Sequence, residues 1–547
     1  MLPTGQIFVL RVSAVLLLLV GNLAAAEFYS SIHEMTKVFG YEQRLLLHMQ
    51  KFIADNESKL DFLKARLIEF ERERDEAASE GVAYFQSPLN KFVLTKRLTL
   101  DWQRVENLMS TETGSMALGR LHKLRRNKRM PSSGEVAGAI DGLLRLQYIY
   151  RLPTKDIAAG ILDGVPYGTE LDAQLCLDIG RQALQDRKTL LAHSWALEAR
   201  QRLNEESLEL QPQILALLVE TKVELEDFQG ANSTYHELIE LQPASEQHAK
   251  NYETFMQANK DKLSQSKNIT DEHDPVPEDF TGLPDDILYR YTCSGHIRPP
   301  PAEFRDLRCG FMSETHPFLI LAPLKVEELQ REPLLVVYHD VIYQGEIDII
   351  KNLTKNRFER AQVMGDNTSV VSTVRTSQFQ FMPKTTHKVL QTIDERVADM
   401  TNLNMDYAED HQFSNYGVGG HYAQHFDYFL PPAFETNQVS PVEWGNRIAT
   451  VLFYLSDVAQ GGGTAFPRLK QLLMPKKGSA AFWYNLHASG APNEQTLHGA
   501  CPIIVGSKWV QNRWIREYIQ GDKRPCEVWD DSLASYSQIK NLKHKLQ

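Results

Sequence analysis

The sequence has little that would suit a nucleic-acid-binding protein or a membrane protein. Its 70 acidic residues outnumber its 59 basic ones, and a formal net charge of -11 argues against nucleic acid as a partner. The basic run Arg120–Arg129 is interpreted as a solvated surface segment, which is what an isolated charge run usually is. Beyond the N-terminus no apolar stretch approaches the roughly 20 residues of a membrane-spanning helix, so no membrane span is expected.

Cysteine is also scarce, because five residues in 547 are too few for a disulfide scaffold. Cys293 and Cys309 are close in sequence, Cys501 and Cys526 are close as well, and Cys176 stands alone. Local pairs would close short loops, each stabilising the fold by about 3 kcal/mol. Spacing does not settle the pairing, and five buried free thiols are the alternative.

The N-terminus has the features of a secretory signal. Arg11 precedes the apolar stretch Val12–Val20, and Ala24–Ala26 supply small residues for a signal peptidase. We therefore expect residues 1–26 to be a signal peptide and the mature chain to enter the secretory route. Sequons of the type Asn-x-Ser/Thr agree with that route and occur at Asn56, Asn232, Asn268, Asn352 and Asn367.

A long helical pattern follows the signal. Apolar residues from Leu46 to Phe70 recur at alternating steps of three and four, which predicts the seam of a coiled coil. Asn56 lies within this seam, so a sequon and a packing position compete there, and we favour packing. A second helix, about Asn90–Met109, is expected to fold back on the first. The pattern allows either a dimerisation arm or an intramolecular bundle.

Residues 134–257 have the pattern of helices separated by short breaks. Ala231 and the stretch Tyr235–Pro243 have the spacing of a tetratricopeptide repeat. The polar, proline-containing segment that follows predicts a linker. Beyond it, short apolar strands alternate with Gly- and Pro-rich turns, as in a jelly roll. The clearest of these strands are Leu334–Tyr338, Ile448–Leu455 and Ala480–Tyr484.

The length is too great for one hydrophobic core, so a multidomain α + β fold is expected. Its expected parts are a signal peptide at 1–26, a helical, coiled-coil dimerisation region at 27–133, an α-helical tetratricopeptide-like domain for peptide substrate at 134–257, a linker at 258–285, a double-stranded β-helix (jelly-roll) oxygenase domain at 286–520 and a C-terminal tail at 521–547.

The chemistry is expected in the β region. In a strand His425 and Asp427 would share one face, and His498 lies 71 residues later on another apolar strand. Two His and one carboxylate are the ligand set of non-haem Fe(II) oxygenases. Because about two His-x-acid triplets are expected by chance, the triplet alone has little weight. Lys508 adds weight, since the far carboxylate of 2-oxoglutarate needs a buried cation.

Five runs in this region carry a resemblance: NYGVGGHYAQHFDYF (Asn415–Phe429), GNRIATVLFYLSDV (Gly445–Val458), GGGTAFP (Gly461–Pro467), PKKGSAAFWYNL (Pro475–Leu486) and HGACPIIVGSKWVQNRW (His498–Trp514). With them the chain resembles the collagen prolyl 4-hydroxylase α-subunit family. The similarity extends over nearly the whole chain, including the N-terminal FYSSIHEMTKV.

The resemblance implies a procollagen-proline 4-dioxygenase that uses Fe(II), 2-oxoglutarate, O2 and ascorbate. His425, Asp427 and His498 match its iron ligands, and Lys508 matches the residue that holds the distal carboxylate of 2-oxoglutarate. The implied reaction couples decarboxylation of 2-oxoglutarate to succinate with hydroxylation of proline at its 4-position. Ascorbate would rereduce iron after uncoupled turnover.

Three further residues match positions around the family's pocket. Tyr416 and Thr464 match residues that line the cosubstrate pocket, and Arg447 matches a basic residue near the peptide site. Without the resemblance they would be interpreted as a core tyrosine, a turn threonine and a surface arginine in an ion pair.

The resemblance also includes both late cysteine pairs. Together with their local spacing it predicts Cys293 bonded to Cys309 and Cys501 bonded to Cys526, with Cys176 unpaired.

The family's substrates are X-Pro-Gly triplets of unfolded collagen-like chains. Its partner is protein disulfide isomerase, in a tetramer of two chains of each kind in the lumen of the endoplasmic reticulum. Since the chain stops at Lys-Leu-Gln with no KDEL-type ending, retention is expected to depend on that partner. The alternatives are a dioxygenase for another luminal residue, or a non-catalytic subunit or collagen chaperone that binds Pro-rich peptide.

One departure from the family lies in the helical part. The family's better-known members hold Pro-rich peptide with a cluster of tyrosines in this domain, whose rings stack on proline. The matching helices of residues 134–257 lack them, which predicts weak binding of poly-proline. The residues that stand there instead include Thr189, Leu190, Leu218, Thr221 and Glu224.

Overall fold

The computed structural model describes residues 31–55, 60–109, 115–126, 130–131, 133–269, 272–355, 357–360, 362–365, 368–371, 376–429 and 444–526. The predicted signal peptide and the sequons at Asn56 and Asn367 lie outside these residues. The described chain forms two compact units, which divide between residues 279 and 280. Within the described ranges, no helix combines the length and apolarity needed to cross a membrane.

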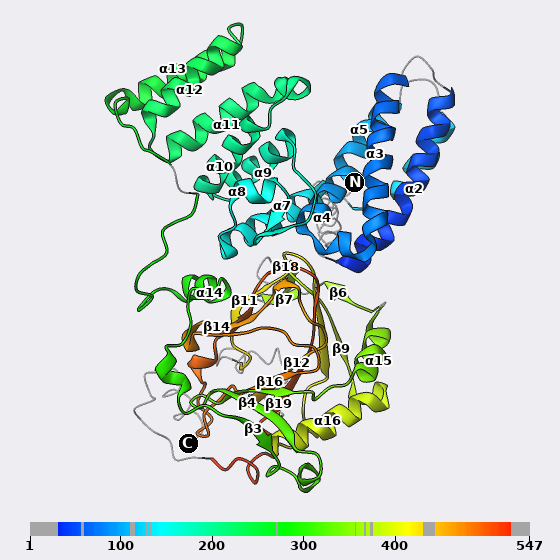
Figure 1. Ribbon diagram of the computed structural model, residues 1–547, viewed down its shortest axis with the longest axis vertical. Coiled ribbons are helices and arrows are strands. Elements are labelled where there is room, and N and C mark those ends of the chain that lie inside the picture. The colour runs from blue at the N-terminus through cyan, green and yellow to red at the C-terminus, as the bar shows by residue number, and fades with distance from the viewer. Residues whose placement is uncertain are drawn as a thin grey trace, which may run out of the picture. The chain divides into compact units, whose positions relative to one another are not determined.

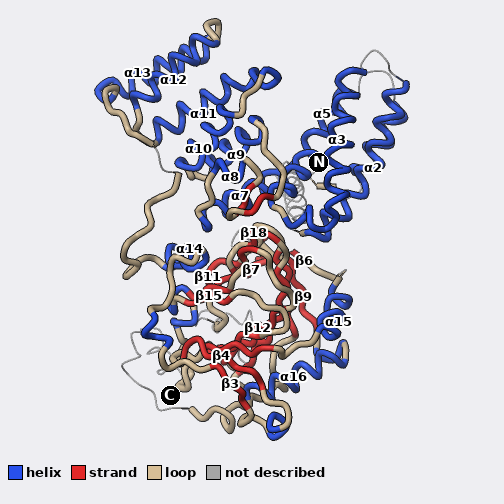
Figure 2. The backbone as a smooth tube through the Cα atoms, viewed as in Figure 1, coloured by secondary structure: helices blue, strands red, loops and turns tan. Residues whose placement is uncertain are grey.

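The first unit is helical and begins with a bundle (Figures 1 and 2). Its helices are α2 (Ile32–Asp55), α3 (Leu60–Glu80), α4 (Pro88–Lys96), α5 (Trp102–Met109) and α6 (Ser115–Arg126). The residues predicted to form one seam, Leu46–Phe70, are divided between α2 and α3, which pack against each other. Met49, Leu63 and Phe70 are buried in this packing. A short π-helical turn, Arg97–Asp101, joins α4 to α5, so the predicted second helix is present in two pieces.

The rest of the helical unit is built from helical hairpins. Its elements are α7 (Ser133–Tyr150), α8 (Thr154–Ala158), the small hairpin of β1 (Ile161–Leu162) and β2 (Val165–Pro166), α9 (Ala173–Gln185), α10 (Thr189–Gln201), α11 (Gln211–Glu224), α12 (Phe228–Leu241) and α13 (Glu246–Asn259). Close packing requires glycine at 180, since a Cβ there would lie 2.9 Å from a Leu217 methyl carbon and 3.3 Å from the Trp195 Cβ. At Gly180, α9 therefore packs a small residue against large side chains of α10 and α11.

Much of the segment predicted as a linker lies against the helical unit. The Glu272 carboxylate accepts hydrogen bonds of 3.0 and 3.1 Å from the Thr154 backbone N–H at the start of α8. The Arg151 guanidinium donates to the Asp274 carbonyl at 2.7 Å, and the Lys267 N–H donates to the Asp227 carboxylate at 3.3 Å. These contacts hold the chain to the unit through Asp274.

The second unit is mainly antiparallel β structure, and its described residues include three α-helices. The helices are α14 (Asp285–Cys293), α15 (Gln344–Thr354) and α16 (Lys388–Thr401). The strands are β3 (Cys309–Met312), β4 (Leu324–Gln330), β5 (Leu335–His339), β6 (Glu359–Arg360), β7 (Gln362–Gly365), β8 (Thr368–Val371), β9 (Gln378–Met382), β10 (His411–Tyr416), β11 (Tyr422–His425), β12 (Arg447–Tyr454), β13 (Gln460–Gly461), β14 (Thr464–Phe466), β15 (Gln471–Leu473), β16 (Ala480–Tyr484), β17 (His498–Ala500), β18 (Ile503–Val505) and β19 (Lys508–Arg516).

Two sheets enclose the interior of this unit. The larger has nine strands in the order β3-β4-β5-β16-β12-β19-β10-β9-β6, and the smaller has four in the order β11-β17-β14-β15. Helices α15 and α16 cover the outer face of the larger sheet (Figure 1), where Ile350 and Ile393 are fully buried. A second core joins the two sheets and includes Phe466 and Trp483. The predicted combination of a helical N-terminal region with a C-terminal antiparallel β domain is thus confirmed.

The alternation of β12 determines which side chains reach the interior. Val451 and Phe453 belong to the core beneath the helices, whereas Leu452 and Tyr454 belong to the core between the sheets. Successive residues of a strand point to opposite faces, so Thr450 shares the inner face. β12 lies at the centre of the larger sheet, between β16 and β19.

The disulfide pairing differs from the prediction. Cys293 at the end of α14 is bonded to Cys501, 208 residues later, and both Cys309 and Cys526 are free and exposed. The two predicted local pairs are therefore wrong in this structure. Cys176 is free and buried, as predicted.

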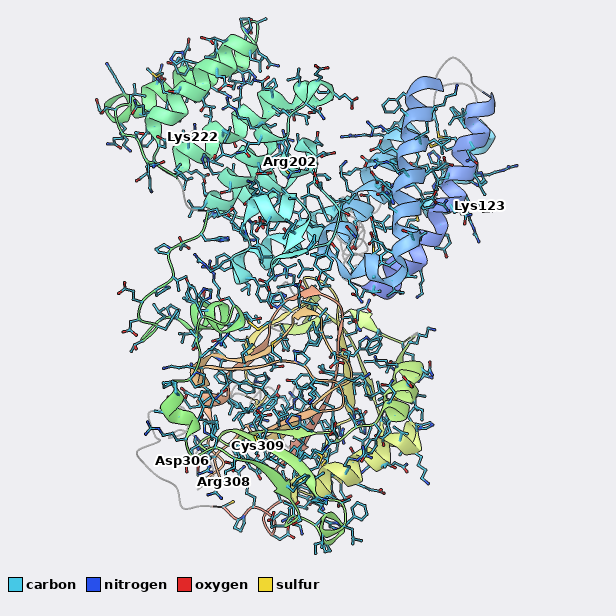
Figure 3. All side chains as sticks on the ribbon, in the orientation of Figure 1. Lys123, Arg202, Lys222, Asp306, Arg308 and Cys309 are labelled. Atoms are coloured by element: carbon cyan, nitrogen blue, oxygen red, sulfur yellow. A yellow bond between two sulfur atoms is a disulfide. The ribbon has the colours of Figure 1, made fainter. Side chains whose placement is uncertain are left out.

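The reason for this pairing is tertiary packing. The Tyr289 hydroxyl on α14 donates a 2.7 Å hydrogen bond to the Ala500 carbonyl, which brings the end of α14 next to the end of β17. Cys309 instead begins β3, the edge strand of the larger sheet (Figure 3). Closeness in sequence was a poor guide because α14 and β3 belong to different parts of the unit.

Candidate metal centre and cosubstrate pocket

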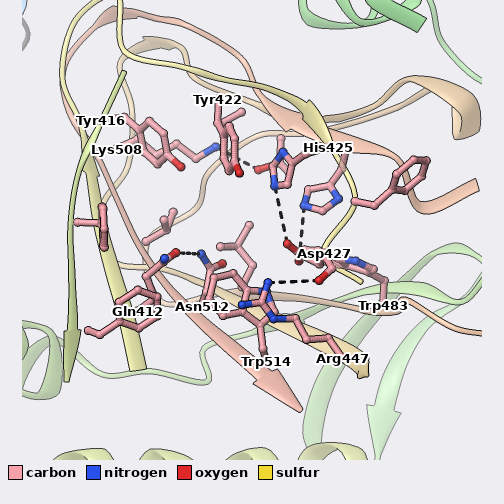
Figure 4. Close-up of a pocket in the computed structure, with 18 of the residues that line it drawn as sticks. Gln412, Tyr416, Tyr422, His425, Asp427, Arg447, Trp483, Lys508, Asn512 and Trp514 are labelled. Carbon is pink, nitrogen blue, oxygen red and sulfur yellow. Dashed lines mark hydrogen bonds and ion pairs between the residues drawn. The ribbon is translucent and has the colours of Figure 1, made fainter. Parts of the chain in front are cut away.

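A pocket of about 500 Å³ lies between the two sheets of the second unit (Figure 4). It is lined by all seven residues predicted to bind metal, cosubstrate or peptide. The lining residues are Phe379, Phe381, Gln412, Tyr416, Tyr422, His425, Phe426, Asp427, Phe429, Arg447, Leu452, Thr464, Trp483, His498, Ala500, Lys508, Val510, Asn512 and Trp514.

His425, Asp427 and His498 converge in this pocket. Each offers one ligand atom, and the three atoms lie within 4.8 Å of one another, an arrangement found nowhere else in the described chain. His425 and His498 are direct partners in the antiparallel pair of β11 and β17, which confirms that a returning strand supplies the third residue. Asp427 lies just beyond the end of β11, so its position does not come from strand alternation as predicted.

Backbone carbonyls select the histidine tautomers. His425 Nδ1 is 2.9 Å from the Ala423 carbonyl oxygen, and His498 Nδ1 is 3.0 Å from that of Thr496. A carbonyl oxygen only accepts, so Nδ1 carries the proton and Nε2 offers its lone pair. Both Nε2 atoms lie 3.7 Å from an Asp427 carboxylate oxygen. This orientation is what metal-binding histidines need.

The carboxylate of Asp427 is buried yet ionised. Burial by itself would raise its pKa, but His498, His425, Arg447 and the Thr450 hydroxyl together outweigh burial and lower the pKa below the usual value. A carboxylate and two imidazole nitrogens are hard and borderline donors that suit Fe(II). The residues present therefore fit a non-haem iron ion, and with three protein ligands they leave positions for a cosubstrate.

Lys508 is a buried cation in the same pocket. Its side chain is 1% exposed, and its Nζ donates to the Gly463 carbonyl at 3.2 Å and to the Thr464 hydroxyl at 3.1 Å. Burial lowers the pKa of Lys508 to about 7. Among the described residues no carboxylate pairs with it, so an anionic ligand group would supply the missing charge.

Tyr416 and Thr464 lie beside Lys508, as the resemblance implied. Tyr416 on β10 is the direct strand partner of Lys508 on β19, and its side chain is buried. The Thr464 hydroxyl bonds both Lys508 Nζ and, at 2.8 Å, the Tyr454 hydroxyl. The sequence analysis missed Tyr454, although the alternation of β12 was a signal that could have placed it on the inner face.

Arg447 lies at the pocket and also takes part in an ion pair. It lines the pocket, and it also forms a bidentate ion pair with Glu409, with two N···O distances of 2.7 Å. Its guanidinium carbon lies 3.7 Å from the ring centre of Trp514. It donates to the Asp427 carbonyl at 3.2 Å, so it also supports the chain that carries the carboxylate.

Aromatic rings enclose the two histidines. The ring of Tyr422 stacks on His425 with centres 3.7 Å apart, and the rings of Trp483 and Phe466 lie 4.8 and 5.3 Å from that of His498. The sequence analysis did not select these rings, because aromatic residues in apolar strands are common in any core. They restrict water and side-chain rotation around the metal ligands.

Two family descriptions match the chain. "Prolyl 4-Hydroxylase alpha-subunit, N-terminal region" matches residues 31–164, and "2OG-Fe(II) oxygenase superfamily" matches residues 411–516. The second range contains the whole triad and Lys508. Fold and site together define an Fe(II)- and 2-oxoglutarate-dependent oxygenase.

Relatives match over nearly the full length. Prolyl 4-hydroxylase subunit alpha-1 of Caenorhabditis elegans is 32% identical, covering 94% of this chain and 93% of the relative. The human subunit alpha-1 is 33% identical, covering 94% of this chain and 98% of the relative. A solved structure of a viral collagen prolyl hydroxylase from Paramecium Bursaria Chlorella virus-1 is 23% identical, with a TM-score of 0.27, and covers 33% of this chain and 95% of that one.

The chain belongs to the prolyl 4-hydroxylase alpha-subunit family. The predicted enzyme class, a prolyl 4-hydroxylase catalytic subunit that uses Fe(II) and 2-oxoglutarate, is confirmed.

Proposed function

We propose that this chain hydroxylates proline to 4-hydroxyproline in X-Pro-Gly triplets of collagen-like polypeptides. One observation carries the proposal: the His425, Asp427 and His498 cluster shares one pocket with a buried Lys508 that has no anionic partner among the described residues. That pairing of sites suits a ligand that is both a metal chelator and a dicarboxylate, which describes 2-oxoglutarate.

The roles of the site residues follow from their contacts. His425 Nε2, His498 Nε2 and the Asp427 carboxylate would hold the iron, which when bound supplies the activation of O2 coupled to decarboxylation of 2-oxoglutarate. Lys508 would pair with the distal carboxylate of 2-oxoglutarate, and Thr464 would bond the same group through its hydroxyl. Ascorbate would restore Fe(II) after uncoupled turnover.

Peptide substrate would enter at the opposite end of the pocket from Lys508. Figure 4 places Arg447 and Trp514 together and apart from Lys508 and Tyr416. Flat aromatic surfaces suit the ring of a proline, and Arg447 can bond a peptide carbonyl while Glu409 fixes its guanidinium plane. Tyr416 closes the cosubstrate end.

The larger architecture is part of the proposal. The bundle within residues 27–133 would pair two chains, residues 134–257 would bind peptide as a tetratricopeptide-like domain, and residues 286–520 would form a double-stranded β-helix oxygenase. The segment 258–285 would connect them. With protein disulfide isomerase the chain would form a tetramer of two chains of each kind in the lumen of the endoplasmic reticulum.

The test is a coupled assay with the purified enzyme, Fe(II), 2-oxoglutarate, ascorbate and a (Pro-Pro-Gly) repeat peptide. Succinate release and 4-hydroxyproline, measured by mass spectrometry of the peptide, should appear in equal amounts. Hydroxylysine in a Lys-containing collagen peptide, without hydroxyproline, would assign the chain to another dioxygenase. Peptide binding without succinate release would make it a binding subunit.

A further inference from the structure

A chain of hydrogen bonds lies behind the carboxylate of Asp427. The Thr450 hydroxyl donates to Asp427 Oδ2 at 2.8 Å, and the Asn485 side-chain amide donates to Thr450 Oγ1 at 2.9 Å. Thr450 and Asn485 are 0% exposed and Asp427 is 5% exposed, so water does not compete with these bonds. Neither Thr450 nor Asn485 lines the pocket, so both act through Asp427.

The direction of these bonds is determined by chemistry. An ionised carboxylate only accepts hydrogen bonds, so the single hydroxyl proton of Thr450 must point at Asp427. The oxygen of Thr450 is then free to accept, and the Asn485 NH2 group supplies the donor. This order fixes the orientation of the amide and the rotamer of Thr450 together. Bonds in such a chain polarise each other and strengthen.

The two donors are held by the centre of the larger sheet. Thr450 is on the inner face of β12, between β16 and β19. Asn485 follows β16, where its backbone N–H donates to the Ile448 carbonyl at 2.8 Å and its own carbonyl accepts from Asn493 at 2.9 Å. Because both residues are held in the sheet, their side chains cannot shift to follow a carboxylate that rotates.

Asp427 needs such support more than the two histidines do. His425 and His498 lie in the paired strands β11 and β17, whereas Asp427 follows the last residue of β11. Outside a strand ladder, its carboxylate is oriented by side chains, and the Thr450 hydroxyl on the larger sheet donates a hydrogen bond to Oδ2. The carboxylate could otherwise rotate about its last torsion, which is soft.

We propose that Thr450 and Asn485 are positioning residues that hold the Asp427 carboxylate facing the two histidines, with Oδ1 3.7 Å from His425 Nε2 and Oδ2 3.7 Å from His498 Nε2. The bond from Thr450 occupies a lone pair of Oδ2 and resists rotation of the carboxylate away from this orientation. This inference rests on the metal role proposed above for Asp427.

The test compares three variants of the full enzyme with a matched control. Thr450→Val removes the hydroxyl at constant shape, Thr450→Ser retains it, and Asn485→Leu removes only the outer donor. The control is Thr292→Val, a fully buried threonine on α14 whose hydroxyl bonds only its own helix at Leu288, 2.8 Å away. Affinity for Fe(II) and Co(II) is measured by competition with a chelator, without turnover, and melting of the metal-free protein checks folding.

Thr450→Val should weaken metal binding by about 10- to 100-fold, as loss of an outer partner of a metal ligand typically does. Thr450→Ser and Thr292→Val should stay within about twofold of the wild type, and Asn485→Leu should fall between. The visible absorption of the Co(II) form should also change in Thr450→Val, since the carboxylate is no longer held in one orientation. The same spectrum and affinity in Thr450→Val and the wild type would overturn the inference.

Two outcomes distinguish failure of the positioning inference from failure of the proposed metal role. If Asp427→Ala binds Co(II) as tightly as the wild type, the proposed role of Asp427 fails. If Asp427→Ala loses the metal while Thr450→Val and Asn485→Leu retain it fully, the positioning inference alone fails. If Thr450→Val does not fold, metal affinity is compared between Asn485→Leu and Thr450→Ser. Weaker binding in Asn485→Leu supports the inference, and equal binding overturns it.

Discussion

The two units present concave sites of opposite character. The oxygenase pocket of about 500 Å³ has at one end the buried Lys508, which has no partner of opposite charge among the described residues. The helical unit has a groove of about 320 Å³ along α9, α11 and α13, whose polar groups are largely exposed and bonded to each other. There Arg181 bonds Gln213 at 2.6 Å and His248 bonds Gln242 at 3.0 Å.

This difference separates a reactive site from an adaptable one. Burying a charge without a partner of opposite charge costs free energy. A ligand of opposite charge therefore explains the position of Lys508. Exposed polar pairs cost little and exchange partners readily with a peptide or with water. We therefore expect sharp effects from changes in the pocket and graded effects from changes in the helical unit.

The largest expected effect is loss of the metal centre. Alanine at His425, Asp427 or His498 should reduce turnover by at least about 10³-fold, because several kcal/mol of catalysis depend on the ion. Hydroxyproline formation under saturating Fe(II) measures this effect. Substantial activity in any one variant would remove that residue from the ligand set, and unchanged melting of the metal-free variant serves as the folding control.

Lys508→Ala should have the second-largest effect. Removing one partner of a buried charge pair costs about 2–5 kcal/mol, so the KM for 2-oxoglutarate should rise by about 10²-fold, while metal affinity stays near that of the wild type. Lys508→Arg keeps the charge and is the matched control. Equal loss of iron binding in Lys508→Ala would contradict the division of roles between the triad and the lysine.

The same lysine predicts a pH dependence. Its pKa near 7 in the free protein means that Lys508 is mostly neutral at pH 8 and must take up a proton when a dicarboxylate binds. Affinity for 2-oxoglutarate should therefore fall as pH rises from 7 to 8.5, and calorimetry in buffers of different ionisation enthalpy should detect proton uptake. Lys508→Arg should show neither effect, and proton release in the wild type would refute the prediction.

Linkage gives the sign of the matching stability effect. Between pH 7 and 10.5 the unfolded chain holds the Lys508 proton that the folded protein has lost. The contribution of this group to the free energy of unfolding therefore increases with pH across that window. The metal-free, ligand-free enzyme is the form in which to measure it.

The smallest expected effect concerns the helical unit, at the positions where other residues replace the family's tyrosines. Thr189 donates to the Glu224 carboxylate at 2.7 Å, and Thr221, fully buried, bonds His193. The chain should therefore bind poly-proline weakly. Substitution of both Thr189 and Glu224 by Tyr should tighten binding about tenfold, since aromatic anchors dominate such interfaces.

Titration of the full chain with poly-proline measures this gain. Glu80→Tyr, at an exposed position of the N-terminal bundle, is the matched control and should leave the affinity unchanged. Wild-type affinity equal to that of a tyrosine-bearing relative would show that the missing rings do not matter.

Part of the metal centre could be predicted because its signal is local. His425 and Asp427 are two residues apart, whereas His498 lies 71 residues after Asp427 and was selected because it lies on another apolar strand. The helical hairpins and the strands β5, β12 and β16 followed from periodicity alone. Lys508 was selected because 2-oxoglutarate needs a buried cation, whereas Tyr416 and Thr464 were selected by resemblance alone.

Features that depend on tertiary packing could not be predicted from the sequence. The bond between Cys293 and Cys501 depends on α14 lying against β17, which no local pattern encodes. Thr450 and Asn485 look like ordinary strand residues until β12 and β16 are paired behind Asp427. The break between α2 and α3 interrupts an apolar pattern that continues across it in the sequence.

The measurement that tests the central claim most directly is anaerobic titration of the Fe(II) enzyme with 2-oxoglutarate, followed by the charge-transfer absorption of the chelated complex. The wild type should develop the band. Lys508→Ala should develop the same band at about 10²-fold higher 2-oxoglutarate, and Asp427→Ala should develop none. A full band in Asp427→Ala, or no band in Lys508→Ala at saturating 2-oxoglutarate, would contradict the assignment of metal and cosubstrate to these residues.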